Sequence, residues 1–412
     1  MHCDAMIIKD AHTYCDQGFK KVDISIDGNG RISDIGPCLK GDEVFDAGGL
    51  IVLPGLHNSH MHASTSLIRG FPVNGGLDSW VSSILWEFEK DLTPGEVYSG
   101  SLYSICQMLR SGITYFEDMH FLETEVLRAC ENAGIKASLS EAVMDRNGWG
   151  RKKANIRTSL ELAKMAKGSE LVDAKLGIVS VRMCSEELID AISQTYAEHS
   201  DIFGGFHLHM DETSQDGDFS RSEYGCPPAQ FFLEKGVLGP DTTIAHCVHI
   251  DDKGMSILSK AGSRVALCPS SNIRLGSGTP PVREMMERGI RLSIGIDSPA
   301  INDGYDIFSD SRLLASISGL SSREMLGIML DGSVVKPGMD ADLVFLDRRD
   351  ALPLGGLDGH ICLSINSRSV VHTMVQGEFV VFDREVLTLD EASVFNDAER
   401  ASASVIDRLD IL

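Results

Sequence analysis

A chain of 412 residues with a formal net charge of −23 is long enough for one large α/β barrel or for two to three smaller domains. The excess of Asp and Glu (60) over Lys and Arg (37) argues against a nucleic-acid partner or an anionic membrane surface, because both would repel it. The 10 cysteines include no CxxC pair, which argues against a zinc knuckle or a disulfide framework and indicates reduced thiols.

The N-terminal residues predict neither secretion nor membrane insertion. They lack the basic stretch and the apolar core of a signal peptide, and no apolar run in the chain approaches the ~18 residues that a membrane helix needs. We therefore expect a soluble, cytoplasmic protein.

Both ends of the chain are rich in short strands. Gly-rich turns separate the strands predicted near the N-terminus, at 5–9, 21–26, 31–35 and 44–47. The C-terminal part repeats this pattern at 341–347, 370–376 and 378–382, before a terminal helix over 389–409. We expect residues 1–52 and 331–412 to form one small β-sandwich domain from both chain ends.

Strand and helix patterns alternate in residues 53–330, which argues for parallel βα units. The predicted strands are 50–57, 112–118, 136–142, 174–181, 202–209, 242–247, 264–268 and 291–296, with helical patterns between them such as 123–133, 155–166 and 186–197. Eight strands fit the α/β architecture of a closed (β/α)8 TIM-type barrel, whose catalytic residues stand at the C-terminal ends of the strands. An open doubly wound sheet usually carries a Gly-rich phosphate turn after its first strand, and this sequence has none.

The first of these strands leads into a pair of histidines. His60 and His62 stand two positions apart, so on an extended strand both imidazoles point the same way and can reach one point in space. Neutral imidazole suits zinc and related divalent ions. Alone, the pair could equally be two unrelated polar residues at a strand end.

Further ligand types stand at the ends of three later strands. His207 and His209 end one strand and are followed by Glu212, the next strand carries His246, and the last is followed by Asp297. Three histidines and one carboxylate can bind one Zn²⁺ and leave room for a water molecule. Together the strand ends predict a hydrolytic metal site at one mouth of a barrel.

Five segments around these residues resemble the amidohydrolase superfamily. They are 54–62 (PGLHNSHMH), 209–213 (HMDET), 245–249 (AHCVH), 268–272 (CPSSN) and 295–297 (GID). Within the superfamily they are similar to the branch of methylthioadenosine/S-adenosylhomocysteine deaminases, guanine deaminases and s-triazine hydrolases. The likeness runs through nearly the whole chain, including 337–344 (PGMDADLV).

The resemblance implies that His60, His62, His209 and Asp297 ligate one divalent metal ion: zinc, with iron or manganese as alternatives. It also implies that His246 hydrogen-bonds the attacking water and that Glu212 shuttles protons. The chemistry agrees, because a zinc-bound water has a pKa of about 7, and Asp297 beside it can accept its proton. Glu212 can then serve as a general acid toward a ring nitrogen and toward departing ammonia.

Three further residues are predicted to bind the substrate. Glu89 matches the glutamate with which adenosine-type family members bind ribose hydroxyls, and His120 follows a strand on the active face. Glu141 stands where relatives that bind homocysteine carry an arginine, and a carboxylate there would repel an amino-acid carboxylate. Three arginines could compensate for it: Arg146, Arg151 and Arg182.

The leading hypothesis is a metal-dependent aminohydrolase that releases ammonia from an amino-substituted purine, nucleoside or related N-heterocycle. An s-triazine-type hydrolase, which displaces chloride or an alkylamine by the same hydroxide attack, is the alternative of the same class. A non-catalytic scaffold with the same fold would have lost metal ligands or the acid, and here all are present. We expect a small-molecule substrate and, as is common for such barrels, a homo-oligomer.

Overall fold

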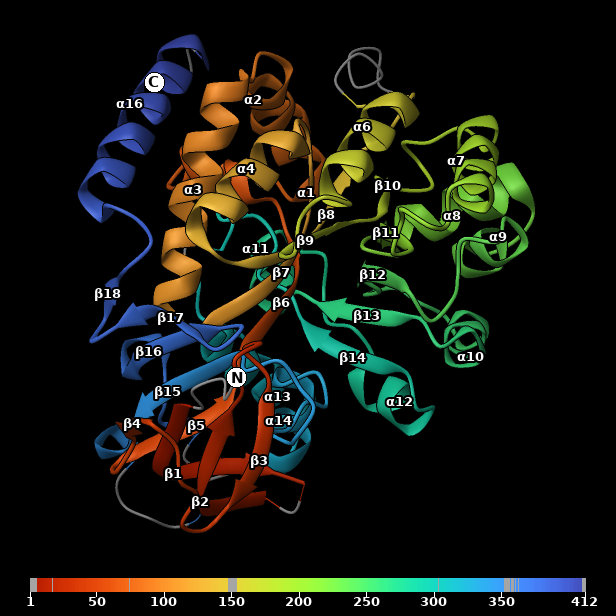
Figure 1. Cartoon of the computed structure of the whole chain (residues 1–412). Coiled ribbons are helices and arrows are strands. Elements are labelled where there is room, and N and C mark those ends of the chain that lie inside the picture. The colour runs from red at the N-terminus through yellow and green to blue at the C-terminus, as the bar shows by residue number, and fades with distance from the viewer. Residues whose placement is uncertain are drawn as a thin grey trace.

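The structure, a computed structural model, describes residues 6–409 except positions 17, 74, 147–153, 303, 352–355, 357, 358, 360 and 362. Parallel strands surrounded by helices form its centre, and a β-sheet built from both chain ends lies below them in the view of Figure 1. The predicted combination of an α/β barrel with a small β domain from both chain ends is confirmed.

The barrel strands form two hydrogen-bonded arcs. The first arc contains β6 (Leu56–Met61), β7 (Ile113–His120), β8 (Lys136–Glu141) and β9 (Val172–Ala174). The second contains β10 (Leu176–Ile178), β11 (Phe206–Met210), β12 (Thr242–His246), β13 (Arg264–Leu267) and β14 (Arg291–Ile294). The fourth predicted strand is divided into β9 and β10 at the buried Lys175. The arcs meet again where Asp297 N donates to His60 O at 2.9 Å and Ile296 N donates to Asn58 Oδ1 at 2.8 Å.

Gly295 lets the end of the barrel approach its first strand closely. A Cβ at this position would lie 2.9 Å from Cβ of His60 and from Sγ of Cys268, closer than real side chains approach. Only glycine fits there without displacing its neighbours. Because His60 and Asp297 flank this contact, closure of the barrel brings the first and last strand ends to the same mouth.

Helices follow the strands and form the outer layer. They are α3 (Pro94–Arg110), α4 (Glu123–Ala133), α6 (Ile156–Ala166), α7 (Glu186–Glu198), α8 (Ser214–Tyr224), α9 (Pro228–Glu234), α10 (Asp252–Ala261), α11 (Pro269–Arg274), α12 (Val282–Glu287), α13 (Ile307–Ser318) and α14 (Ser322–Met329). A capping box of Thr93 and Glu96 begins α3, and Gly134 with a φ of +74° ends α4. The helices predicted at 123–133, 155–166 and 186–197 match α4, α6 and α7 within one residue.

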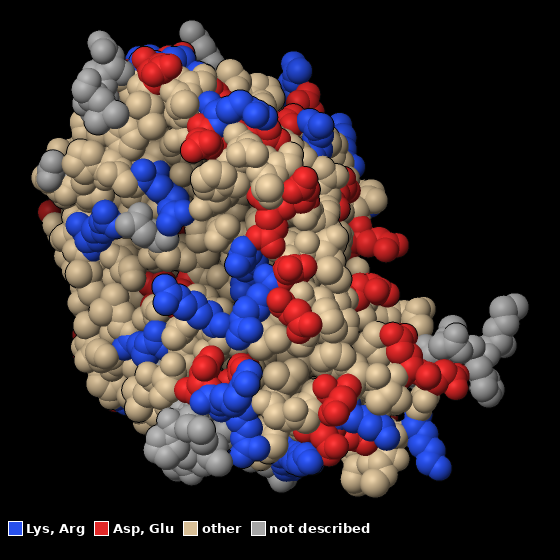
Figure 2. Space-filling model, turned by 90° about the vertical axis from the view of Figure 1, so that its left-hand side faces the viewer, with Lys and Arg blue, Asp and Glu red and all other residues tan. Residues whose placement is uncertain are grey.

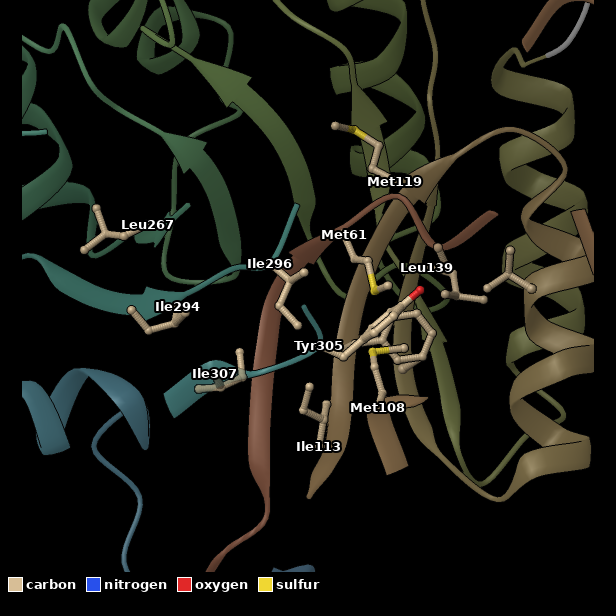
Figure 3. Packing of buried hydrophobic residues seen from close by; sticks show 14 of the residues in the cluster. Met61, Met108, Ile113, Met119, Leu139, Leu267, Ile294, Ile296, Tyr305 and Ile307 are labelled. Carbon is tan, nitrogen blue, oxygen red and sulfur yellow. The ribbon is translucent and has the colours of Figure 1, made fainter. Parts of the chain in front are cut away.

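A hydrophobic core fills the space between the strands and the helices. Figure 3 shows Met61, Met108, Ile113 and Tyr305 among its buried side chains. The Asn58 amide on β6 lies against this core, with Nδ2 3.2 Å from the sulfur of Met61 and 3.8 Å from that of Met108. The thioether sulfurs are weak acceptors for this buried donor, while Asn58 Oδ1 accepts from Ile296 N, two residues after the end of β14. The core therefore fixes β6 directly before the two histidines.

Strands from both chain ends form one nine-stranded sheet with the order β18-β17-β16-β15-β5-β1-β2-β3, and β4 pairs with β1. The bounds are β1 (Met6–Cys15), β2 (Gly18–Ile26), β3 (Ile32–Gly36), β4 (Glu43–Asp46), β5 (Leu50–Pro54), β15 (Leu343–Asp347), β16 (Val370–Val375), β17 (Glu378–Phe382) and β18 (Glu385–Val386). The sheet has a core of its own, which includes Ile8, Ile24, Val52, Phe345 and Met374. The domain limits at residues 52 and 330 stay a prediction.

The strand predicted at 50–57 is divided between the two sheets. β5 pairs with β15 in the nine-stranded sheet, whereas β6 begins the barrel. Between them, a Cβ on Gly55 would lie 2.0 Å from Thr114 Oγ1, so the chain crosses at a position where a side chain does not fit. The prediction of a single strand was wrong here, because a continuous apolar run does not reveal where a chain changes sheets.

Short helical elements follow β6 and lie at the C-terminal mouth of the barrel. They are η1 (Ala63–Ile68), α1 (Leu77–Trp80), the π-helical turn η2 (Val81–Leu85) and α2 (Trp86–Lys90). The terminal helix α16 (Glu391–Leu409) lies alongside α3, where Arg408 Nη1 donates to Glu96 Oε1 at 2.6 Å (Figure 1). Two 3-10 turns, η3 (Arg348–Ala351) and η4 (Ser367–Ser369), lie in the C-terminal part.

The surface carries its charges in a mixed arrangement on the face drawn in Figure 2, where basic and acidic side chains are interspersed. Among the described residues, no helix combines the length and the apolar character that a membrane span requires.

Candidate active site

Four side chains from three strand ends converge at the C-terminal mouth of the barrel. His60 and His62 come from the end of β6, His209 from β11 and Asp297 from the segment after β14. The Nε2 atoms of His62 and His209 are 3.4 Å apart, and Asp297 Oδ1 lies 3.4 Å from His60 Nε2 and 3.3 Å from His62 Nε2. The ligand atoms of His60, His62 and His209 lie within 4.8 Å of one another, and the Asp297 carboxylate lies beside the first two.

The far side of each imidazole is held by a hydrogen-bond partner. His62 Nδ1 donates to Met119 O and His209 Nδ1 donates to Val179 O, both at 2.7 Å, which leaves each Nε2 lone pair directed at the common point. His60 Nδ1 lies 2.9 Å from Nε2 of the buried His207, while His60 Nε2 is fully buried and has no hydrogen-bond partner in the described structure. Such anchoring of the distal nitrogen is typical of metal-binding histidines.

The charges of this cluster suit a divalent cation. Burial opposes ionisation of Asp297, but the neighbouring imidazoles of His60 and His62 outweigh it and hold the pKa of its carboxyl well below the usual range. Burial also opposes protonation of His62, yet Asp297 raises the pKa of its imidazole to about 9. The cluster thus favours a positive charge beside the Asp297 carboxylate, which a divalent cation can supply. The residues present fit a metal ion.

His246 and Glu212 lie beside the cluster. His246 Nδ1 donates to Asn272 Oδ1 at 2.9 Å, so its Nε2 lone pair faces the site, 3.7 Å from Glu212 Oε2. His246 Nε2 also lies close enough to His60 and Asp297 to join them in holding an ion. Burial raises the pKa of Glu212 to about 7, with Asp297 and Asp216 adding to the rise and His246 opposing it. A carboxyl with this pKa can exchange a proton at neutral pH.

The backbone is strained at this mouth of the barrel. Asp211, His246, Cys247 and Asp297 all have positive φ values, between +50° and +76°, which non-glycine residues rarely adopt. Each of them stands at or just after the end of a barrel strand. Such strain persists only where the surrounding structure enforces it, and it gathers at functional sites.

A cavity of about 630 Å³ opens above the cluster, a size typical of small-molecule sites. His62, His209, His246, Glu212 and Asp297 lie at its floor. The apolar lining comes mostly from other segments: Leu77, Trp80, Val81, Leu85, Trp86, Met144, Met183, Phe219, Leu275 and Ile301. Arg182 is the single lysine or arginine among the described residues that line it.

Residues 77–90, comprising α1, η2 and α2, form one wall of this cavity, and we call them the pocket cover. Glu89 lines the cavity from this segment, as the sequence predicted for a substrate-binding residue, and its Oε1 accepts a hydrogen bond from His120 Nε2 at 3.0 Å. His120 also lines the cavity, and its Nδ1 lies 2.9 Å from Ser64 Oγ. These two predicted substrate residues therefore act as a hydrogen-bonded pair.

Glu141 does not line the cavity. Its side chain is buried behind β8, where Oε1 accepts a hydrogen bond from Glu123 N at 3.1 Å, and burial raises the pKa of its carboxyl to about 8. The N-cap residue of α4, Leu122, offers no polar side chain, so the Glu141 carboxylate provides the acceptor that this helix start needs. Glu141 therefore lies outside the lining of this cavity, and its role in substrate binding stays a prediction.

The sequence predictions assigned no role to several polar residues at the site. Ser271 donates a short hydrogen bond to Asp297 Oδ2, and Asn272 orients His246. Ser277 Oγ lies 3.4 Å from Glu212 Oε1. All three stand on or just after α11, in the segment that follows β13, and their position directly after a predicted barrel strand was the available signal.

Comparison with known proteins agrees with this geometry. A family model described as the amidohydrolase family matches residues 51–380. A 5-methylthioadenosine/S-adenosylhomocysteine deaminase of Natronomonas pharaonis is 33% identical, and the match covers 92% of each chain. A 5′-deoxyadenosine deaminase of Methanosarcina mazei is 30% identical over 98% of this chain and 99% of the relative. An adenosine deaminase from Xanthomonas campestris with bound zinc has the same fold, with a TM-score of 0.89 at 20% identity over 98% of this chain and 99% of that one.

Proposed function

This chain belongs to the amidohydrolase family, and from that premise we propose that it is a zinc-dependent deaminase of adenine nucleosides whose 5′ position carries a small neutral group. The chain is a hydrolase of C–N bonds and releases ammonia from an amino-substituted purine or nucleoside. The choice of zinc, of a single ion, of the residues below and of the 5′ group is part of the proposal.

One observation carries it: the buried Glu212 stands beside the converging ligand atoms at the floor of an otherwise apolar cavity. Hydrolytic deamination needs an activated water and an acid on the same side of a flat ring, and this arrangement supplies both. A non-catalytic scaffold would not need a buried carboxyl beside these ligand atoms.

His60, His62, His209 and Asp297 would hold the zinc ion, with the tautomer of each histidine set by its distal hydrogen bond. When bound there, the ion acidifies a water molecule so that hydroxide is available at neutral pH.

The protein groups move the protons of the reaction. Asp297 takes the proton that the water loses, and His246 Nε2 directs the oxygen at the ring carbon that bears the amino group. Glu212 in its acid form gives a proton to the adjacent ring nitrogen as the C–O bond forms. The new hydroxyl group then returns a proton to Glu212 as the ring carbonyl forms, the proton held by Asp297 reaches the amino group, the C–N bond breaks, and ammonia leaves. Water and the amine are consumed, and a ring carbonyl and ammonia result.

The cavity also suits the rest of a nucleoside. Glu89 is the acceptor that vicinal ribose hydroxyls need, and the bond from His120 fixes its carboxylate. Trp80, Trp86 and Phe219 offer aromatic surface to a purine or to an apolar 5′ group.

Arg182 is not free to bind a carboxylate on the 5′ side. Its three nitrogen groups are occupied by Asp78 at 2.9 Å, Gln215 at 2.7 Å and Asp216 at 2.9 Å. Arg146, the second arginine considered from the sequence, is held by Cys184 O and the Tyr224 hydroxyl and does not line the cavity. Arg151 lies outside the described residues. These contacts favour a neutral 5′ substituent over the amino-acid group of S-adenosylhomocysteine.

The test is ammonia release by the zinc-loaded enzyme over a substrate panel of 5′-deoxyadenosine, 5′-methylthioadenosine, adenosine, S-adenosylhomocysteine, guanine and a chlorotriazine. We expect kcat/KM for the two neutral 5′-modified nucleosides to exceed that for S-adenosylhomocysteine by at least about 100-fold, because burying an unpaired carboxylate costs several kcal/mol. Equal rates would contradict the neutral 5′ group. Chloride release without deamination of any purine would favour the triazine alternative.

Glu89→Gln tests the ribose contact. We expect KM for 5′-deoxyadenosine to rise by about 10-fold to 100-fold, since a hydrogen bond to a charged acceptor contributes about 1.5–3 kcal/mol. The matched control is a 2′,3′-dideoxy nucleoside, which has no hydroxyls for Glu89 to bind, so its KM should hardly change between the two proteins. An equal rise in KM for both substrates would place Glu89 elsewhere in the binding mode.

A further inference from the structure

The pocket cover is joined to the barrel near both of its ends. At its C-terminal end Glu89 accepts the bond from His120, and at its N-terminal end Asp78 Oδ1 accepts from Arg182 Nη2 at 2.9 Å. Gly76, with a φ of +80°, precedes the cover, and the π-helical turn η2 lies in its middle. π-helical turns are rare and frequently occur at functional sites.

Arg182 is shared between the cover and the barrel. It follows β10, and its guanidinium is about one quarter exposed. Nη2 binds Asp78 of the cover, whereas Nε donates at 2.9 Å to Oδ1 of the buried Asp216 in the first turn of α8. A planar guanidinium presents its donors in a fixed fork, so it fixes the direction of each carboxylate as well as its distance.

Asp216 links Arg182 to Glu212, the proposed general acid. Its second oxygen, Oδ2, accepts from the backbone N–H of Glu212 at 3.0 Å and more weakly from that of Thr213 at 3.4 Å. Asp216 is almost fully buried, and Arg182 is its ion-pair partner. Asp211, directly before Glu212, has a φ of +50°. The backbone that aims Glu212 at the cavity is thus strained and held from one side by Asp216.

We propose that Arg182 is a positioning residue that, through Asp216, holds Glu212 in its catalytic orientation and ties that orientation to the seating of the pocket cover over the substrate. This inference rests on the proposed function, because it takes Glu212 as the general acid. Without Arg182, Asp216 has no cationic partner, so its carboxylate is no longer fixed in the position where it accepts the hydrogen bond from Glu212 N. The pocket cover also loses the hydrogen bond of Asp78 at its N-terminal end. A displacement of about 1 Å at a catalytic group can cost 100-fold in rate.

Three variants distinguish the contact of Arg182 with Asp78 from its contact with Asp216. With 5′-deoxyadenosine as substrate, Asp78→Asn should raise KM about fivefold and leave kcat within about twofold, because it weakens only the tie to the cover. Arg182→Met should lower kcat by about 10-fold to 100-fold as well as raise KM. Arg182→Lys should recover most of the kcat, since an ammonium still pairs with Asp216, but little of the KM.

The matched control is Arg221→Met. Arg221 lies on α8, the helix that carries Asp216, and pairs with an aspartate, Asp251, at 2.8 Å, but it does not line the cavity. We expect this variant to keep kcat and KM within about twofold, as is usual for surface pairs. If Arg182→Met behaves like Arg221→Met, or if Asp78→Asn lowers kcat as much as Arg182→Met does, the proposal is overturned. Should Arg182→Met not fold, Asp216→Asn takes its place: it removes the charge that Arg182 pairs with, so it should lower kcat, and an unchanged kcat would overturn the proposal.

A double variant separates this inference from the proposed function. In a Glu212→Gln background, Arg182→Met should cause no further loss of kcat, because the group that it positions is already absent. A full additional loss would mean that Arg182 acts independently of Glu212 and would overturn the positioning role. If Glu212→Gln alone left kcat unchanged, the proposed acid would fail, whatever the effect of Arg182.

Discussion

Glu212→Gln lowers kcat for deamination by an expected 10²-fold to 10⁴-fold, roughly the range that one positioned general acid contributes. Glutamine keeps the size of the side chain and can still approach His246 and Ser277, but it has no proton to give to a ring nitrogen. Steady-state kinetics with 5′-deoxyadenosine measure the loss. Metal content per chain should stay unchanged, because Glu212 is not one of the four converging ligands.

Asp211→Asn is the matched control for this prediction. Asp211 is the neighbouring carboxyl, and burial raises its pKa to about 7 as well, but it does not line the cavity. Asparagine tolerates the positive φ at this position better than most residues do. We expect the Asp211 variant to keep kcat within a few fold of the wild type. A similar collapse in both variants would assign the effect to the local fold and not to acid catalysis.

The pH dependence of kcat follows from the same carboxyl. Burial raises the pKa of Glu212 to about 7, so the acid form is present below that pH and is lost as the pH rises through it. We therefore expect kcat of the wild type to fall along an alkaline limb near pH 7. The residual activity of Glu212→Gln should lack this limb, whereas Asp211→Asn should keep it. A limb that persists in Glu212→Gln would belong to another group.

The convergence of the ligands could be predicted because it depends on topology. In a parallel barrel every strand ends at the same mouth, so histidines and an aspartate at the ends of predicted strands are brought together without knowledge of loop structure. The period of two on an extended strand placed His60 and His62 on one side in the same way. Helix α4 was equally predictable, since an apolar stripe and a following Gly134 mark it in the sequence.

Other features depend on partners that are distant in sequence and have no periodic signal. The guanidinium of Arg182 meets Asp78 across 104 positions, and Asn272 meets His246 across 26. For Glu141 the position was predicted but the direction of the side chain was not. Its place at a strand end predicted that it would face the cavity, yet its carboxyl accepts a hydrogen bond from Glu123 N at the start of α4, which has no side-chain cap. A position relative to the strands is therefore predictable, whereas the direction of a polar side chain depends on which donors and acceptors its neighbours leave unsatisfied.

His209→Ala should abolish metal binding and deamination together. Of the four proposed ligands, His209 is the one that comes from β11. Its removal leaves His60 and His62 from the end of β6 and Asp297 from the segment after β14, two parts of the chain that lie next to each other where the barrel closes. Loss of a Lewis acid worth several kcal/mol corresponds to a fall in kcat of about 10³-fold or more. Metal analysis of the purified chain and ammonia release measure the two effects.

Stability provides an independent readout of the same centre. A ligand that binds only the folded state stabilises it by about 4 kcal/mol when present at 1,000 times its Kd, so EDTA should lower the Tm of the wild type by several degrees. The Tm of His209→Ala should not respond to EDTA. His57→Ala is the matched control: its ring lies on β6, the strand of His60, but packs against Tyr115, 5.1 Å away, so metal content and the EDTA response should remain. An EDTA response that survives in His209→Ala would mean that other groups, such as His246, hold the ion, because the convergence of His60, His246 and Asp297 would then suffice for binding.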